Sequence, residues 1–172
     1  TATQVALIRY TLDGTEPTMA NGATFDQTLR ISETTTVRAK AFREGYEPSN
    51  TDTQTYLFLE DVIRQASDGR APEGWPTRWG SNTVDYGMDP DVVNHASYRD
   101  TIIDDLKTIP SVSVVMDLDD MFSASNGIYA NPSQDGRQWE RQCSVEMMHP
   151  DGKEGFQINA GIRVRGGFSR ST

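Results

Sequence analysis

Apolar and polar residues alternate over several short stretches of residues 1–59, as expected for strands that bury one face. The clearest is TTVRAKAF at 35–42, where valine and two alanines alternate with arginine, lysine and phenylalanine. Turn residues separate the stretches, first Asp13-Gly14 with Pro17 and later Gly45 with Pro48. With roughly a dozen residues between strands and no helical periodicity, this part predicts a small immunoglobulin-like β-sandwich.

Residues 60–172 combine signals for helices and strands, which predicts an α+β unit. Asp89 precedes Pro90, so a capping carboxylate stands before a proline suited to the first helical position. The segment YRDTIIDDLKTIP places apolar residues on one helical face and ends at Pro110, and SVSVVMD at 111–117 has the length and composition of a strand. The fold class predicted for the whole chain is therefore mainly β with some helix.

The most regular pattern is a hairpin, RQWERQCSVEMMHPDGKEGFQINAGIRVRGG, at 137–167. PDGKEG supplies the turn, and two long antiparallel strands are predicted over roughly 138–165. Cys143 falls in an apolar row, which favours a buried and unreactive thiol. The apolar face of the returning strand consists of Phe156, Ile158, Ala160, Ile162 and Val164, and its polar face of Gln157, Asn159, Gly161, Arg163 and Arg165.

Composition limits the classes of partner. The chain has 16 Lys and Arg residues against 25 Asp and Glu residues, a net charge of -9, which repels nucleic-acid phosphates and anionic lipid. No apolar run approaches the roughly 18 residues of a membrane span, and one cysteine cannot form an intrachain disulfide. The start, TATQVALIRY, lacks an initiator methionine and a leader, so we expect an interior piece of a longer protein.

Candidate chemistry is sparse. Asp13 and Glu16 could bind a cation, but acids in turns usually cap backbone amides. No catalytic triad or metal-ligand spacing occurs, so we assign no catalytic and no metal-binding residue. The extended stretch at 68–90 contains Trp75, Trp79 and Tyr86. We expect these rings to lie across a neighbouring surface, with a carbohydrate-binding platform as the alternative.

Two stretches of the first third resemble a known module. YTLDGTEPT and TLRISETTTVRAKAFREGYEPSNTDTQTYLF look like the chitobiase/β-hexosaminidase C-terminal domain, an immunoglobulin-like accessory module of bacterial secreted proteins. The resemblance covers about residues 1–59, without the module's opening strand. It implies a spacer or adhesion role with no catalytic group.

A second resemblance covers about residues 60–172. The motifs IPSVSVVMD, GIYANP, WERQCSVE and GIRVRGGFSR, in this order, look like the amino-terminal part of the spore coat protein H (CotH) family. This family is similar to atypical protein kinases that transfer the γ-phosphoryl group of ATP to surface or coat proteins with Mg²⁺. The resemblance implies an extracellular or cell-envelope protein.

The RGGFSR motif falls where this family has a glycine- and serine-rich connection between strands. The resemblance implies that the connection contacts the phosphates of ATP, through Arg163, Arg165, Gly166, Gly167, Ser169 and Arg170. From the residues alone, a Gly-Gly pair after a strand is more often a turn or bulge, so both interpretations stay open. The family's lysine strand and its acids for base and metal would lie beyond Thr172, so we expect this piece by itself to be inactive. The alternative function is that of a non-catalytic adhesion or carbohydrate-binding surface protein.

Overall fold

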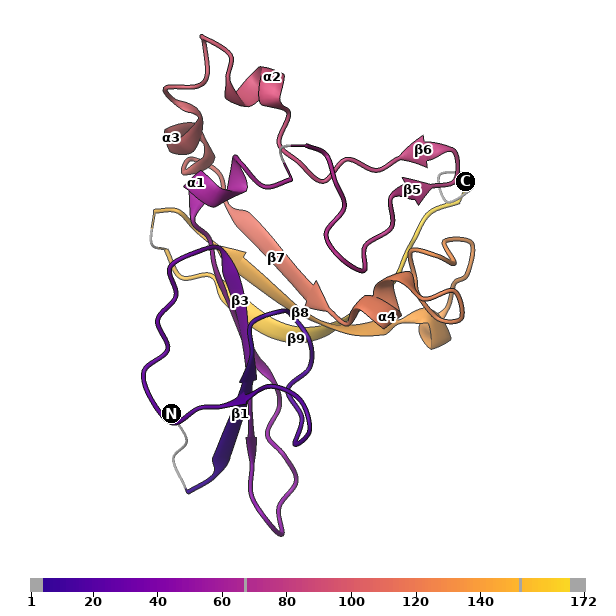
Figure 1. Ribbon diagram of the computed structural model, residues 1–172. Helices are drawn as coiled ribbons and strands as arrows, with labels where there is room; N and C mark the ends of the chain where they lie inside the picture. Colours follow the sequence, from indigo (N-terminus) through magenta and orange to yellow (C-terminus); the bar gives the residue numbers. More distant parts are fainter. Residues whose placement is uncertain (1–4, 67, 152, 168–172) are drawn as a thin grey trace.

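The computed structural model describes residues 5–66, 68–151 and 153–167, and most of its regular structure is antiparallel sheet (Figure 1). The first sheet, called the N-terminal sheet below, has the strand order β2-β1-β3-β4. Its strands are β1 (Leu7–Thr11), β2 (Ala23–Thr24), β3 (Thr35–Phe42) and β4 (Asp52–Tyr56). The strands predicted from alternation in this part are therefore present, with the alternating segment TTVRAKAF forming β3.

A second sheet, called the C-terminal sheet below, has the order β7-β8-β9. Its strands are β7 (Ser111–Met116), β8 (Arg141–Met148) and β9 (Phe156–Ile162). A two-stranded ribbon is made of β5 (Arg78–Trp79) and β6 (Asn82–Thr83). The helices are short: α1 (Leu59–Val62), α2 (Pro90–Val93), α3 (Ile102–Leu106), α4 (Leu118–Phe122) and the 3-10 turn η1 (Arg137–Trp139). The predicted fold class, mainly β with some helix, is confirmed.

Local sequence signals account for several of these elements. The Asp89 carboxylate accepts a hydrogen bond from the Asp91 amide at 2.8 Å, so the cap predicted before Pro90 is present at the start of α2. The Asp13 carboxylate accepts one from the Thr15 amide at 3.0 Å. Gly14 next to it has φ +80°, a backbone conformation that favours glycine. None of the helices in the described residues is long and apolar enough to cross a membrane.

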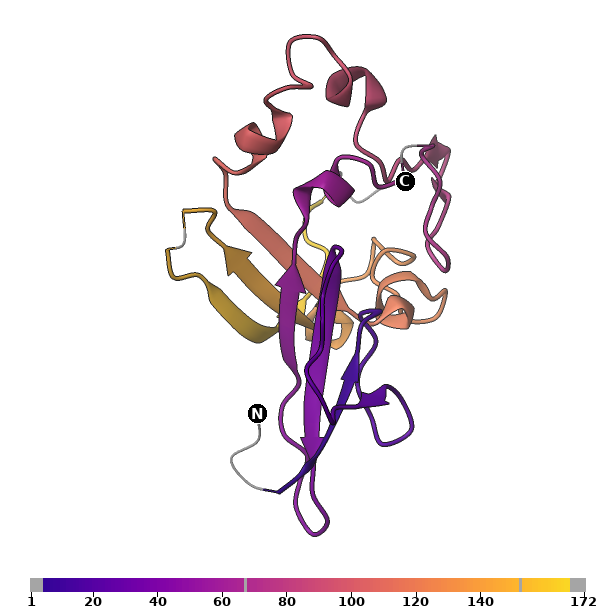
Figure 2. The same cartoon turned by 60° about the vertical axis from the view of Figure 1, so that its left-hand side comes forward.

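The two sheets meet through polar side chains, at a contact that we call the polar seam. Thr53 of β4 is 0 % exposed and Ser144 of β8 is 1 % exposed, and their hydroxyls lie 2.8 Å apart. The hydroxyls of Thr55 and Ser113 lie 2.7 Å apart in the same contact. Figures 1 and 2 show the N-terminal sheet lying against the C-terminal sheet in both views. Two of the most completely buried side chains of the described molecule are thus polar and hydrogen-bonded.

The seam forms a directed chain of hydrogen bonds. The Ser144 hydroxyl donates to Asn159 Oδ1 at 2.9 Å, and Asn159 Nδ2 donates to the Thr51 carbonyl at 2.9 Å. Since Ser144 has a single hydroxyl proton, the Thr53 hydroxyl must be the donor to Ser144. The chain therefore runs from Thr53 through Ser144 and Asn159 back to the backbone next to Thr53.

The seam also covers the open edge of the N-terminal sheet. β4 pairs only with β3, so its other side presents backbone groups without a strand partner. The Glu146 carboxylate accepts from the Thr55 amide at 2.8 Å, and Asn159 satisfies the Thr51 carbonyl. Side chains of the C-terminal sheet thus complete hydrogen bonds that an additional strand would otherwise make.

The C-terminal sheet turns its polar face inward and leaves its apolar face largely outside. Phe156 is 46 % exposed and Ile158 is 50 % exposed, although the sequence pattern suggests a core face for their row. Val112 and Val114 of β7 are also exposed, and the register places Val114 beside Val145 and Ile158 on this same face. The alternation was predicted correctly, but the polar residues are inside because β4 supplies partners for them.

The predicted hairpin is present but shorter than the predicted span of 138–165. Trp139 belongs to η1, and the Glu140 amide bonds back to the Arg137 carbonyl, so β8 begins only at Arg141. Ile162 pairs with Arg141, and the chain beyond Ile162 has no strand to pair with. Arg163 and Arg165 therefore lie past the end of β9 rather than on its polar face, which corrects the prediction.

The aromatic stretch at 68–90 lies across a neighbouring surface, as predicted. The ring centroid of Trp75 lies 5.0 Å from that of Phe122 and 5.4 Å from that of Tyr86. The centroid of Trp79 lies 4.2 Å from that of Tyr129. These contacts join the β5–β6 region to α4 and the segment that follows it. The division into units at 1–59 and 60–172 stays a prediction.

The seam predicts that Ser144→Ala destabilises the protein although it removes a single oxygen atom. The Thr53 donor and the Asn159 acceptor both lose their buried partner, which costs about 1–3 kcal/mol in the free energy of unfolding. Urea denaturation followed by circular dichroism measures this loss. Ser133→Ala, at an exposed position, is the matched control and should leave the midpoint unchanged. A loss no larger for Ser144→Ala than for the control would contradict the role of the seam.

Candidate functional site

Three of the residues predicted to contact phosphate lie together just past the end of β9. Arg163, Arg165 and Gly166 line a pocket of about 270 Å³ with Val164 and the 135–136 turn, which we call the arginine pocket. Gly167 follows directly, whereas Ser169 and Arg170 lie outside the described residues. The structure thus gathers part of the predicted set around one small cavity.

The backbone of the arginine pocket is open to a bound group. Gly166 has φ +136° and Gly136 has φ +83°, conformations that side-chain-bearing residues rarely adopt. A Cβ added at Gly136 would lie 2.5 Å from the Gln138 amide oxygen, whereas one at Gly167 would meet no atom within 4 Å. Glycine is therefore favoured at 136 by its backbone conformation, since the end of the Gln138 side chain could move aside, and at 167 it leaves free space.

The charge of the arginine pocket suits an anion. Arg163 and Arg165 are both exposed, and neither forms a hydrogen bond or ion pair with another residue of the described segments. Two guanidinium groups with free N–H donors can bind phosphate or carboxylate in a bidentate manner. Asp135 also lines the pocket, and its carboxylate opposes binding of an anion.

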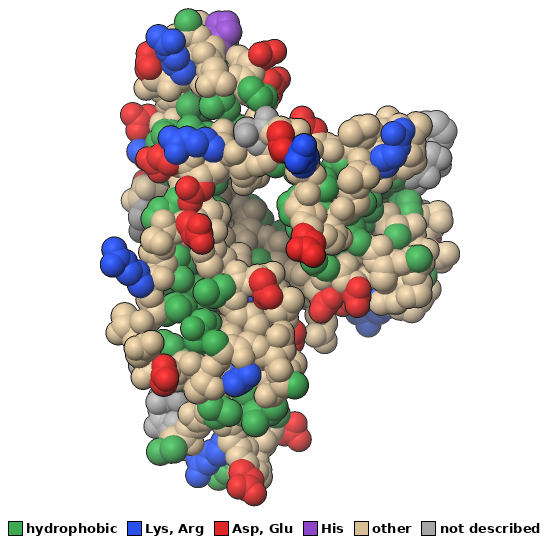
Figure 3. All heavy atoms as spheres, in the orientation of Figure 1, with side chains coloured by type: hydrophobic (Ala, Val, Ile, Leu, Met, Phe, Trp, Pro, Cys, Tyr) green, Lys and Arg blue, Asp and Glu red, His purple; other side chains and the backbone are tan. Residues whose placement is uncertain are grey.

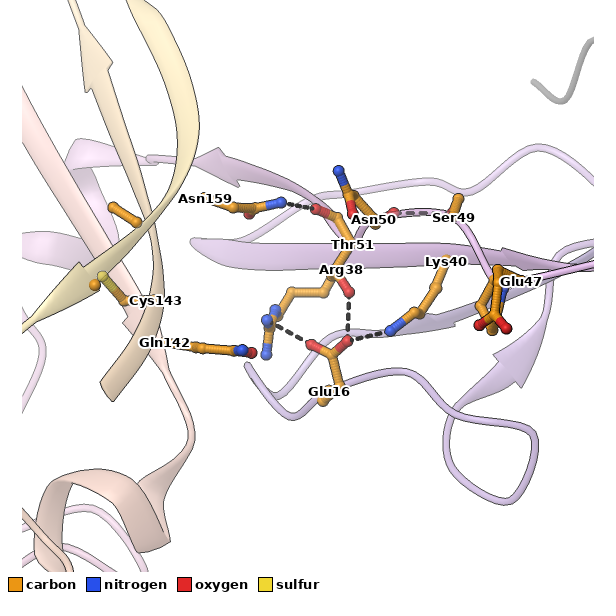
Figure 4. A pocket seen from close by; sticks show the side chains of 13 residues that line it. Glu16, Arg38, Lys40, Glu47, Ser49, Asn50, Thr51, Gln142, Cys143 and Asn159 are labelled. Atoms are coloured by element: carbon orange, nitrogen blue, oxygen red, sulfur yellow. Dashed lines mark hydrogen bonds and ion pairs between the residues drawn. The ribbon is translucent and has the colours of Figure 1, made fainter. Parts of the chain in front are cut away.

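A second cavity, called the junction cleft here, lies between the two sheets (Figure 4). It measures about 610 Å³ and is lined by β3, the 47–51 segment, β8 and β9. Figure 4 shows Arg38 and Gln142 reaching toward each other from opposite walls. Its charged lining consists of Glu16, Arg38, Lys40 and Glu47. Sequence reasoning missed this cleft, because the residues come from distant segments and only the packing of the sheets brings them together.

Glu16 is the centre of an ion cluster in the junction cleft. Its carboxylate lies 2.7 Å from Arg38 Nη2 and 2.9 Å from Lys40 Nζ, and it accepts a hydrogen bond from the Thr51 hydroxyl. Arg38 Nη1 also donates to the Gly14 carbonyl at 3.0 Å. The cluster ties the turn after β1 to β3, so Glu16 does more than the local capping that the sequence suggests.

The cluster keeps Glu16 charged. Burial by itself raises the pKa of the Glu16 carboxyl, but the hydrogen bonds from Thr51 and Lys40 and the charges of Arg38 and Lys40 outweigh it. The net pKa is therefore lower than the ordinary glutamate value. A carboxylate held by two cations and a hydroxyl is a poor general base, and its role here is structural.

Other candidate groups do not form a site. Among the residues that the structure describes, no three His, Cys, Asp or Glu side chains converge to hold a metal ion. Cys143 is buried, and this burial raises the pKa of its thiol. A buried thiol with a raised pKa is a weak nucleophile, which agrees with the unreactive cysteine predicted from the apolar row.

Comparison with known proteins finds a likeness for the first part of the chain. A family model described as Fn3 associated matches residues 1–56, roughly the first third of the sequence. Searches of curated proteins and of solved structures give no significant match. The first third is therefore similar to Fn3-associated domains, while the likeness to a chitobiase-type module and to the CotH family remains a proposal.

The ion cluster predicts a stability that depends on pH. Because the pKa of Glu16 is lower in the folded than in the unfolded protein, its charge stabilises the fold above about pH 4.5. This contribution is lost as the pH falls through the lower folded pKa. The melting temperature of Glu16→Gln should therefore lie below that of the original protein at pH 7, and the difference should shrink toward pH 3.

Thermal melts across this pH range measure the effect. Glu47→Gln is the control, because it removes a carboxylate from the same cleft without breaking an ion pair of the described residues. If the difference between Glu16→Gln and the original protein is constant from pH 7 to pH 3, the stabilising role of the Glu16 charge is wrong.

Proposed function

We propose that this chain contributes the phosphate-contacting part of a kinase-like enzyme similar to the CotH family, attached to an Fn3-associated module. The observation that carries the proposal is the arginine pocket, with two arginines free of ion pairs in the described segments beside Gly136 and Gly166, which have positive φ. In phosphoryl transfer a protein acts mainly by positioning phosphates and supplying positive charge. The arginine pocket offers both.

The proposed role of each residue follows from its place. Arg163 and Arg165 would bind nonbridging oxygens of the ATP phosphates through charge-assisted hydrogen bonds. Gly166 and Gly167 would let backbone amides approach the same oxygens, because no side chain stands in the way. Bound Mg²⁺ would neutralise phosphate charge, and we assign none of its ligands to the described residues.

The proposal includes the setting of the enzyme. A CotH-like domain beside an Fn3-associated module supports an extracellular or cell-envelope location, with surface or coat proteins as substrates. The net charge of -9 is unfavourable for nucleic-acid partners. The N-terminal sheet would then serve as a rigid support for the C-terminal sheet, because the polar seam joins them.

One observation favours a second candidate function, that of a carbohydrate-binding surface protein. Trp75 and Trp79 remain partly exposed although they pack in the aromatic cluster. Arg78 and two prolines line a small cavity beside Trp79, and aromatic surfaces next to polar groups suit sugar rings. Tryptophan fluorescence during titration with cellulose and chitin oligosaccharides tests this function separately.

The nucleotide proposal predicts that Arg165→Ala and Arg163→Ala each weaken binding of ATP with Mg²⁺ by about 1–3 kcal/mol, the usual size of a lost charge-assisted contact. Isothermal titration calorimetry measures the affinity, with inorganic triphosphate as a second ligand that lacks the nucleoside. Arg99→Ala is the matched control, since this arginine is exposed and forms an ion pair with its sequence neighbour Asp100.

Thermal melts on the same variants separate binding from folding. Arg163 and Arg165 are exposed and without ion pairs in the described segments, so their replacement should leave the melting temperature unchanged. A turn with a purely structural role gives the opposite result, a lower melting temperature with unaltered affinity. That result, or failure of the original chain to bind either ligand, would reject the proposed function.

A further inference from the structure

β7 is an open edge of the C-terminal sheet. It pairs with β8 on one side, and within the described part of the chain no hydrogen bond satisfies its backbone groups on the other side. An edge strand with unpaired N–H and C=O groups is a template for a further strand. β4, by contrast, has its edge covered by the polar seam. Of these two edges, β7 is the one left available.

An apolar groove follows this edge. Its volume is about 530 Å³, and Val114, Val115 and Met116 all line it. Successive side chains of a strand point to opposite faces, so a cavity that touches three in a row reaches both sides of β7. At one end it also extends over the apolar face to Ile162 of β9. Figure 3 shows the molecular surface hollowed next to β7, between the part that carries β4 and α1 and the part that carries β5 and α4. We call this cavity the β7 groove.

The walls of the β7 groove come from both halves of the chain. One wall is formed by the turn at 12–15 and the start of β3, and the other by Trp75 and α4. Leu12 and Leu118 line the groove, and both are more than one-third exposed. Apolar side chains that border an unpaired strand edge provide pockets for alternate side chains of an added strand.

One acidic side chain lines the β7 groove, and two more stand next to a lining residue in the sequence. Asp13 lines the groove, and Asp117 and Asp119 flank Leu118 in the sequence. All three are exposed, and none of them forms an ion pair with another described residue. Acidic side chains border the lower side of the hollow in Figure 3. Charge complementarity therefore calls for an occupant that carries basic residues.

We propose that the β7 groove binds an extended polypeptide segment in which apolar residues alternate with lysine or arginine. The segment pairs with β7 through its backbone and adds a strand to the C-terminal sheet. Its apolar side chains enter between Leu12 and Leu118, and its cations lie near Asp13, Asp117 and Asp119. This binding surface goes beyond nucleotide binding and does not depend on it.

A synthetic peptide tests the proposal directly. The probe is a fluorescein-labelled Lys-Val-Lys-Val-Lys-Val-Lys peptide, and binding to the whole chain is followed by fluorescence anisotropy in the absence of nucleotide. We expect saturable binding that weakens as salt is added. A second peptide, methylated at every backbone nitrogen, cannot donate to β7 from either of its edges and should not bind. A third peptide with glutamate in place of lysine should bind much more weakly.

Variants locate the binding to the groove. Leu118→Gln should lower the affinity about tenfold, the order expected when one leucine no longer contributes its burial. Asp13→Asn should weaken binding and reduce its salt dependence. Glu44→Gln is the control: it removes an exposed carboxylate that does not line the groove, and it should change neither the affinity nor the salt dependence. Thermal melts of each variant show that it is folded.

Several results would overturn the proposal. These are the absence of binding by the lysine peptide, equal binding of the methylated peptide, and unaltered affinity in Leu118→Gln. Sedimentation equilibrium tests whether a second copy of the chain occupies the groove instead. A dimer of the original protein that dissociates in Leu118→Gln would show this and reject the peptide proposal. ATP titration of the same variants should be unaffected, so failure here is distinct from failure of the proposed nucleotide site.

Discussion

The relation between the two sheets depends on the satisfaction of buried hydrogen bonds along the polar seam. A buried hydroxyl or amide without a partner costs free energy that dispersion contacts do not recover, so the arrangement is acceptable only when every member of the chain is paired. The buried hydroxyls of Thr53 and Ser144 meet this condition in one geometry, and the more exposed Asn159 accepts from Ser144 and donates to the Thr51 carbonyl. A small shift of either sheet would break several of these bonds together. The seam therefore specifies orientation more strongly than an apolar contact of the same size would.

This choice of interface explains the unusual surface of the C-terminal sheet. Since the polar face is used for the seam, the apolar face that carries Val112, Val114, Phe156 and Ile158 is left partly open. The covering that does exist comes from α4 and Trp75, at the end of the sheet where Met116 and Ile162 lie. The same arrangement leaves β7 as an open edge beside apolar walls. Because the C-terminal sheet packs with its polar face, its apolar row is exposed and the β7 groove has apolar walls.

Much of the local structure could be predicted from the sequence, because alternation and turn chemistry act over a few residues. The alternation in TTVRAKAF gave β3, Asp89 before Pro90 gave a capped helix, and PDGKEG gave the hairpin between β8 and β9. The long-range arrangement could not be predicted in this way. Periodicity separates two faces of a strand, but the partner across the interface decides which face is buried, and here β4 made it the polar one.

The candidate sites show the same division between local and distant information. Arg163, Arg165 and Gly166 are neighbours in sequence, so their meeting in one pocket follows from the chain itself. Their position beyond β9 was missed, because the strand ends where η1 removes Glu140 from the ladder. The junction cleft and the β7 groove each combine segments far apart in the chain. No local signal in a single sequence could have found them.

The short connection between β4 and α1 gives the molecule a further property. Leu57 and Phe58 alone separate the two elements, and both sides of this step are tied, since the Phe58 amide donates to the Thr34 hydroxyl and the Thr34 amide donates to Asp61 Oδ2. A step of this kind is too short and too constrained to act as a hinge. The direction in which the chain leaves the N-terminal sheet is therefore set by β4, and α1 is held in place against the start of β3.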